Sequence, residues 1–301
     1  MKSRLIVILA ATLLLASCEK AAAPPAYTPT LSSAPARAKL AEYTFAVTPM
    51  SNFRDVYDVF QPIMDYMNAR LPGARLVLEV PRGLDEHDHQ LAARRFAFAL
   101  SNPWHTWRAA QTGGYTIFGK FSDNENFRGI WIVRKDSGIK SLTDLKGKKI
   151  CFPPKSALAA TMMTRMQLRE NGVDPLRDVS VTYVGSQHAS IMEVYTKGAV
   201  AGATWPLAWI NFQRLNPEES KELEARFPTT SLINQGLVAR NDVPPELVRH
   251  VAELLQGMDQ TPEGRALLKA VPVRRFEPAG TADYEVVHTF MEKYKKAFPA
   301  D

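Results

Sequence analysis

The stretch Asp144-Leu-Lys-Gly-Lys-Lys-Ile-Cys-Phe152 indicates the fold class of this 301-residue chain, because it has the pattern of a turn followed by a short apolar strand. Pro153-Pro154-Lys155 then leads into a helix, for which Ser156 is the expected N-cap and Gly172 the expected C′ residue. Residues 179–184 form the next expected strand. A strand, a helix and a second strand in this order are typical of parallel α/β sheets.

The same alternation continues on both sides of this stretch. Upstream, an expected strand over residues 43–47 precedes an amphipathic helix that begins at Phe53 and contains Pro62, which should kink it. The other expected strands are 76–80, 96–100, 130–135, 199–204 and 232–239. The other expected helices are 85–94, a helix through Trp107, 190–197, 206–215 and most of 244–298. At roughly 150 residues per domain, the length suggests two such α/β domains.

Composition excludes several classes of protein. A hydrophobic fraction of 46% with 23% charged residues is that of a globular chain rather than a disordered one. Two cysteines cannot build a disulfide scaffold, a zinc ribbon or an iron–sulfur cluster. The net charge is +6, but the densest basic run, residues 146–149, holds only three cations and is expected to be a solvated turn. We therefore expect no nucleic-acid partner.

The N-terminus has the pattern of an export signal followed by a tether. Lys2 and Arg4 precede a twelve-residue apolar run, which is too short to span a bilayer and typical of a signal peptide. The run ends in Leu15-Ala16-Ser17-Cys18, which resembles a bacterial lipobox. The sequence therefore predicts a signal peptide over residues 1–17, a lipidated Cys18 and an extended Ala/Pro-rich tether over residues 18–42.

Motifs of enzymes and metal sites are absent from the sequence. Gly114-Tyr-Thr-Ile-Phe-Gly-Lys120 approaches a P-loop, but Phe121 replaces the hydroxyl residue that would hold magnesium. His87-Asp88-His89 lacks a third ligand at a diagnostic spacing, and we interpret it as a solvated helix start. Cys151 lies in an apolar strand and is expected to be a buried structural thiol. We expect neither catalysis nor a cofactor nor a bound metal.

Two longer segments resemble a known family. They are residues 141–152 with the later Glu170-Asn-Gly-Val-Asp-Pro175, and residues 183–203, which include Gly185-Ser-Gln-His-Ala-Ser-Ile191. Both are similar to the second lobe of periplasmic phosphate-, phosphite- and phosphonate-binding proteins, which deliver ligands to ABC importers. The resemblance spans roughly residues 43–269.

The resemblance implies a two-lobed periplasmic-binding-protein fold of type II, in which the ligand lies between the lobes of a Venus flytrap. Two hinge crossings are then expected near residues 129–135 and 234–240. Lobe one would hold residues 43–128 plus 236–301, and lobe two would hold residues 129–235 together with the hinge strands.

The chain departs from the family pattern at several positions of the ligand site. The usual hydroxyl cluster at the start of the lobe-two helix is reduced to Ser156, and the histidine common in the following loop falls on Gln187. His188 takes the place of a usual acid, and Thr204-Trp205 that of another. Near the first-lobe loop, Trp104-His105 replaces an expected aromatic hydroxyl. Aromatic groups thus replace polar ones.

Candidate ligand contacts follow from the rule that ligands lie beyond the carboxyl ends of the strands of α/β sheets. We expect Trp104 and Trp205 on opposite lips of the cleft, while Arg128 could either counter an anion or be an ordinary surface residue. Ser156 could bind ligand or serve only as a helix cap. The full predicted set is Asn52, Asn102, Trp104, His105, Arg128, Ser156, Ala157, Gln187, His188, Thr204 and Trp205.

Two functions fit this reading. The first is a lipid-anchored, monomeric solute-binding protein on the periplasmic side of a bacterial membrane, which passes a small ligand such as an oxyanion or a phosphonate-like compound to an ABC permease. The second is the same binding body acting as the ligand-sensing input of a membrane sensor kinase. Both use ligand-driven closure of two lobes.

Overall fold

The computed structural model describes residues 40–271 and 273–299, and all statements below concern this part of the chain. Residues from Leu40 onward form one compact unit. The predicted signal peptide, the predicted lipidation site Cys18 and nearly all of the predicted tether lie outside the described residues. Strand β1 (Ala41–Val47) begins within the last two residues of the segment expected to be tether.

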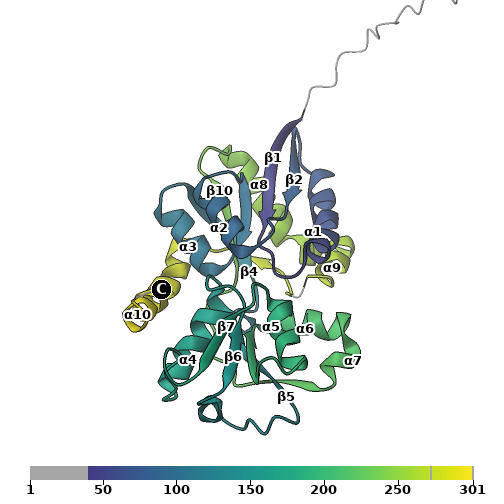
Figure 1. Cartoon of the computed structure of the whole chain (residues 1–301). Helices are drawn as coiled ribbons and strands as arrows, with labels where there is room; N and C mark the ends of the chain where they lie inside the picture. Colours follow the sequence, from purple (N-terminus) through teal and green to yellow (C-terminus); the bar gives the residue numbers. More distant parts are fainter. Residues whose placement is uncertain (1–39, 272, 300–301) are drawn as a thin grey trace, which may run out of the picture. The chain divides into compact units, whose positions relative to one another are not determined.

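Two β-sheets organise the unit, one in each lobe (Figure 1). The first sheet has the strand order β11 (Phe276–Glu277), β4 (Tyr115–Phe121), β10 (Gly236–Arg240), β3 (Phe98–Ser101), β1, β2 (Ala74–Glu79). The second has the order β7 (Ser180–Tyr183), β6 (Lys149–Phe152), β8 (Ala201–Thr204), β5 (Ile130–Arg134), β9 (Leu223–Arg226).

The sheets are mixed rather than purely parallel, which corrects the expectation drawn from the strand–helix alternation. Strands β2, β1 and β3 run parallel, as do β7, β6 and β8. By contrast, β10 is antiparallel to β3 and β4, and β5 is antiparallel to β8 and β9. The physical reason is that β5 and β10 are each entered directly from the other lobe, so no crossover helix reverses the chain before them.

Helices flank both sheets. In lobe one they are α1 (Phe53–Asn68), α2 (Leu84–Ala92), α3 (Pro103–Gln111), α8 (Pro245–Gln256), α9 (Pro262–Leu268) and α10 (Glu285–Ala297). In lobe two they are α4 (Thr164–Glu170), α5 (Gln187–Tyr195), α6 (Pro206–Leu215) and α7 (Pro217–Ser220). A π-helical segment (Leu158–Met163) runs directly into α4. Short 3₁₀ turns are Asn124–Asn126, Leu142–Leu145, Met258–Gln260 and Thr281–Tyr284.

Two adjacent segments connect the lobes, residues 122–129 between β4 and β5 and residues 227–235 between β9 and β10. They are hydrogen-bonded to each other, because Thr229 N–H donates to the Gly129 carbonyl over 2.9 Å and Leu232 N–H donates to the Phe127 carbonyl over 2.9 Å. The expected crossings are therefore displaced toward the N-terminus. The expected crossings share residues 129 and 234–235 with these segments, and strands β5 and β10 account for nearly all of the rest.

The cores show where the lobes join. One apolar cluster lies within lobe one, and two lie within lobe two. A further cluster contains side chains of both lobes, among them Phe96 and Tyr294 from lobe one with Met163 and Trp205 from lobe two. The lobes therefore share a continuous apolar contact.

Two sequence expectations are confirmed by the packing. Cys151 is fully buried in β6, as expected of a structural thiol, and desolvation raises its pKa to about 11. Gly172 follows the end of α4 with φ of +73°, a left-handed conformation that favours glycine. Within the described residues, no helix combines the length and apolar character that a membrane crossing requires.

Candidate ligand site

Two cavities lie between the lobes. The inner cavity has a volume of about 40 Å³ and the outer cavity about 500 Å³. Pro49, Met50, Leu84 and Gln187 line both cavities, so we call these four residues the neck. The two cavities are therefore two parts of one cleft.

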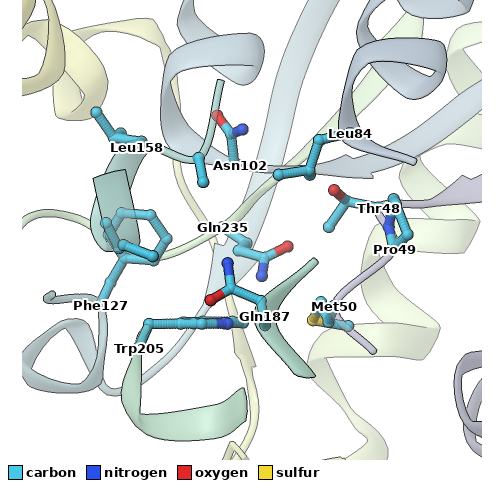
Figure 2. Close-up of a pocket in the computed structure, with 13 residues that line it drawn as sticks. Thr48, Pro49, Met50, Leu84, Asn102, Phe127, Leu158, Gln187, Trp205 and Gln235 are labelled. Atoms are coloured by element: carbon cyan, nitrogen blue, oxygen red, sulfur yellow. The ribbon is translucent and has the colours of Figure 1, made fainter. Parts of the chain in front are cut away.

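The inner cavity is polar on several sides but carries no charged side chain among the residues that line it. Thr48 follows β1, Asn102 is the N-cap of α3, Gln187 begins α5 and Gln235 precedes β10. Figure 2 shows the amide groups of Gln187 and Gln235 in the middle of the ring of labelled residues. Four elements from both lobes thus bring neutral hydrogen-bonding groups to one point.

Two of these groups have no hydrogen-bond partner. Thr48 and Gln235 are each only 2% exposed, yet Thr48 Oγ1 and Gln235 Oε1 are buried without a partner. A buried polar atom without a partner costs about 1–3 kcal/mol. Two such atoms in one cavity indicate a place where a ligand or ordered water supplies the missing hydrogen-bond partner.

The start of a helical segment lines the same cavity from lobe two. Ala157 is the N-cap of the helical segment that begins at Leu158, and residues 157–160 all line the inner cavity. The first carbonyl of this segment, that of Ala157, accepts from Thr161 N–H over 2.8 Å. The N–H groups of residues 158–160 come before that first bond, so they have no partner within the helix. Such a helix start favours a negatively charged or strongly polar oxygen.

The walls of the inner cavity are apolar. Trp205 is 5% exposed and meets Phe127 edge to face, with ring centroids 5.9 Å apart. Both rings line the cavity together with Leu158 (Figure 2). Apolar walls around a few convergent polar groups are the usual arrangement of a small-molecule site.

The structure brings most of the predicted site residues to this cleft. Thr204 does not line either cavity but donates a hydrogen bond from Oγ1 to Gln187 Oε1 over 2.8 Å, which orients the Gln187 amide. The predicted residues that line the inner cavity are Asn102, Ala157, Gln187 and Trp205, and those that line the outer cavity are Asn52, Gln187 and His188.

Trp104 and His105 do not line either cavity. The Trp104 ring stacks on Trp107, with centroids 5.3 Å apart, and Lys295 of α10 lies over it. Trp104 therefore faces α10, which corrects the expectation that it forms a lip of the cleft opposite Trp205. The reason is that α3 begins directly after Asn102, its N-cap, and the first turn of the helix carries Trp104 round to the side that packs on α10.

His105 belongs to a buried polar cluster in lobe one. Its Nδ1 lies 3.2 Å from Asn102 Nδ2, and burial together with the nearby Arg108 lowers its pKa to about 3. His87 is also fully buried, and its Nε2 lies 2.8 Å from Ser101 Oγ. Burial and the neighbouring His105 lower the pKa of His87 to about 3. The interpretation of His87 as part of a solvated helix start is therefore wrong, because α2 turns this side chain inward.

Ser156 and Arg128 also lie outside the two cavities. Ser156 is not the N-cap, a position taken by Ala157, and its Oγ instead donates to Asp85 Oδ1 of lobe one over 2.6 Å. The neighbourhood of Pro153 and Pro154 delays the helix start by one residue. Arg128 is partly buried within the first crossing segment, and its Nε is without a partner.

Sequence reasoning missed Thr48, Leu84 and Gln235. Thr48 follows the expected strand 43–47 directly, so the rule of strand ends could have found it. Gln235 precedes β10, the strand that is antiparallel to its neighbours, so its cavity position is at the start of a strand rather than its end. No local pattern distinguishes such a residue.

Two α/β lobes with a cavity lined from both sides define a binding protein of the type II periplasmic class. Residues 45–284 match the family of periplasmic substrate-binding proteins of ABC transporters for phosphonate, and the chain belongs to this family. The resemblance expected from the sequence is thereby confirmed. Membership implies a periplasmic location, a small-molecule ligand and an ABC transporter permease as partner, and it makes the chain a binding protein rather than an enzyme.

Individual relatives agree with this assignment. The chain is 21% identical over 199 residues to a probable ABC transporter phosphite binding protein, PhnD1 of Prochlorococcus marinus (strain MIT 9301), a match that covers 62% of this chain and 67% of that protein. The structure of PhnD1 in complex with methylphosphonate superposes with a TM-score of 0.77 at 17% identity and covers 85% of this chain and 98% of that one. A binding protein of an ABC phosphonate transporter from Pseudomonas aeruginosa gives 0.77 at 14% identity, over 86% and 88% of the two chains.

Proposed function

We propose that the inner cavity binds the head group of a small phosphorus oxyanion, of the phosphonate or phosphite class, which the protein delivers to an ABC importer. The observation that carries this proposal is the pair of buried, unpartnered polar atoms, Thr48 Oγ1 and Gln235 Oε1, in a cavity that is also lined by the start of a helical segment. A tetrahedral oxyanion can satisfy donors from several directions at once.

Neutral donors are sufficient for an anion in this setting. Hydrogen bonds to a charged group contribute about 1.5–3 kcal/mol each, and the helix start adds a favourable dipole. The Thr48 hydroxyl can donate, and the Gln235 amide offers both a donor and an acceptor whichever way it is turned. An acceptor in the cavity favours an oxyanion that keeps a proton at neutral pH, as phosphorus oxyanions do, over sulfate.

The relatives support the same chemistry. PhnD1 is described as phosphite-binding and has been solved with methylphosphonate. The inner cavity of about 40 Å³ is of a size that suits a head group of a few heavy atoms, not a large molecule.

Titration calorimetry with the mature body tests the proposal. We expect methylphosphonate and phosphite to bind and sulfate to bind at least tenfold more weakly. Gln235→Glu should weaken methylphosphonate binding more than a hundredfold, because it places a carboxylate against the oxyanion. The matched control Gln260→Glu, at an exposed position, should bind as wild type. Absence of binding of every phosphorus oxyanion, or full affinity of Gln235→Glu, would reject the proposal.

We further propose that Cys18 carries a lipid that holds the body at the periplasmic side of a membrane. The Leu15-Ala16-Ser17-Cys18 ending of the apolar run supports this. Wild-type protein should fractionate with membranes, and Cys18→Ser should be released or remain unprocessed. A processed Cys18→Ser protein that stays with the membrane would contradict the anchor.

A further inference from the structure

The outer cavity persists although the two lobes touch beside it. Asn211 Nδ2 of lobe two donates to Asp55 Oδ2 of lobe one over 3.2 Å, and Ser156 Oγ donates to Asp85 Oδ1 over 2.6 Å. Asp55 and Asn211 themselves line the outer cavity. Because hydrogen bonds already join the lobes here, the volume of about 500 Å³ is a chamber that contact of the lobes leaves unfilled.

The chamber is continuous with the place proposed for the oxyanion. The four neck residues line both cavities, and two of them, Leu84 of lobe one and Gln187 of lobe two, are each the first residue of a helix. A ligand whose head lies in the inner cavity can therefore extend past Leu84 and Gln187 into the chamber.

The chamber has the size and chemistry of an organic subsite. Phe53 lines it and is 59% exposed, and the His188 ring packs on Phe212 with centroids 5.4 Å apart, both again in the lining. A volume of about 500 Å³ lies within the usual 300–1,000 Å³ range of pockets that hold organic ligands. Aromatic walls of this kind favour a flat ring through stacked or edge-to-face contact.

We propose that the outer cavity is a subsite for a ring-sized organic substituent, so that the ligand class includes aryl- or arylalkyl-phosphonates as well as the smallest members. This proposal rests on the proposed function, because the head group is taken to lie in the inner cavity.

Gly83 allows the chamber to be filled without disturbing its walls. It lines the outer cavity, its φ of −161° is ordinary extended backbone, and a Cβ added to it would meet nothing within 4 Å. Gly280 is a matched control, since it too is extended, a Cβ there would also meet nothing within 4 Å, and it lines neither cavity.

The experiment compares the affinities of methylphosphonate and benzylphosphonate for wild type, Gly83→Trp and Gly280→Trp by calorimetry. Wild type should bind benzylphosphonate at least as tightly as methylphosphonate. In Gly83→Trp the ratio of benzylphosphonate to methylphosphonate affinity should fall at least tenfold, and in Gly280→Trp it should be unchanged. Phe53→Ala, which shortens an exposed side chain, should lower the same ratio about threefold and serves if Gly83→Trp does not fold.

The possible failures are distinguishable. If wild type binds methylphosphonate but not benzylphosphonate, the subsite is refuted while the proposed function stands. If Gly83→Trp weakens both ligands equally, the chamber does not hold the substituent and the inference is likewise refuted. If no phosphorus oxyanion binds to wild type, the proposed function and the subsite both fail.

Discussion

The lobes meet in two places that differ in chemistry. Around α10 and along the inner cavity, side chains of both lobes share one buried apolar cluster, whereas beside the outer cavity the lobes are joined by single hydrogen bonds between polar side chains. Burial of apolar surface is favourable in proportion to its area, while an exposed hydrogen bond that exchanges with water contributes little. The two contacts should therefore respond very differently when the lobes part.

The α10 contact is dense and buried. Arg165 of α4 is 2% exposed and donates from Nη1 to Tyr294 Oη over 2.5 Å. Its guanidinium also lies 4.2 Å from the centre of the Phe298 ring. On the other side, α10 packs on α3 through the stack of His288 on Trp107, with centroids 4.4 Å apart. This helix from lobe one thus holds one element of each lobe (Figure 1).

The contact beside the outer cavity is sparse by comparison. Ser156 meets Asp85, and Asn211 meets Asp55, at positions where the side chains are exposed or partly so. Water can replace both bonds when the lobes separate. We infer that the α10 contact stays closed while the cleft opens, so that the crossing segments and α10 together act as the pivot.

The largest expected effect comes from breaking the apolar contact. Phe298 is 2% exposed, and truncation of a buried phenylalanine costs about 3–5 kcal/mol. Phe298→Ala should therefore lower the free energy of unfolding by that amount, as measured by urea denaturation, and it also removes the ring over Arg165. Leu176→Ala, at a leucine that is 62% exposed, is the control and should change stability by less than about 0.5 kcal/mol. Equal stability of the two variants would mean that α10 does not hold the lobes together.

The sequence predicted most of the elements but not this contact. Strands such as 96–100 and helices such as 206–215 carry local patterns of apolar residues and caps; the strand is present with a small shift as Phe98–Ser101, and the helix has the predicted bounds. Residues 244–298 were predicted as helical, which α8, α9 and α10 confirm, but the two-residue strand β11 lies among them. So short a strand exists only because Phe276 and Glu277 pair with β4, which no local pattern reveals.

The site was predictable to the extent that it depends on strand ends. Asn102, Gln187 and Trp205 follow β3, β7 and β8 within a few residues, and all three line the inner cavity. The prediction for Trp104 was wrong because the direction of its side chain depends on the first turn of α3 rather than on the strand before it. The prediction for Ser156 was wrong because its hydroxyl donates to Asp85 of the other lobe, a residue 71 positions away in the sequence.

Lowering the pH should destabilise lobe one, because two of its buried histidines are neutral in the folded protein. His87 and His105 are buried and neutral, with pKa values lowered from 6.5 to about 3 by desolvation. Below pH 6.5 the unfolded chain binds protons that the folded protein does not, so stability falls as the pH is lowered from 6.5 toward 3. Between pH 6.5 and pH 5 the loss should be about 1.5 kcal/mol for each histidine.

Urea denaturation at a series of pH values measures this loss. His89→Gln changes an exposed histidine of α2, the helix that also carries His87, and should retain the full pH dependence. His105→Gln should remove about half of it. A wild-type protein as stable at pH 5 as at pH 7 would show that these two histidines are not held neutral in the folded state.

The smallest effect should come from breaking the contact at the cleft. Ser156 was expected either to bind ligand or to cap a helix, but its hydroxyl instead joins the lobes through Asp85. Ser156→Ala should therefore change the free energy of unfolding by less than about 1 kcal/mol, because one partly exposed hydrogen bond is replaced by water. The closed state of the variant lacks this bond between the lobes, so closure is slightly less favourable. Affinity for methylphosphonate should therefore fall only about two- to fivefold. Ser220→Ala, which removes a hydroxyl bonded within lobe two, should leave affinity unchanged.

Solution scattering gives a second measurement of the same contact. The radius of gyration of the ligand-free Ser156→Ala protein should be larger than that of wild type. Phe298→Ala, in contrast to Ser156→Ala, should also lose stability. A loss of affinity above tenfold in Ser156→Ala would return this hydroxyl to the ligand site and remove the distinction between a permanent contact at α10 and a reversible one at the cleft.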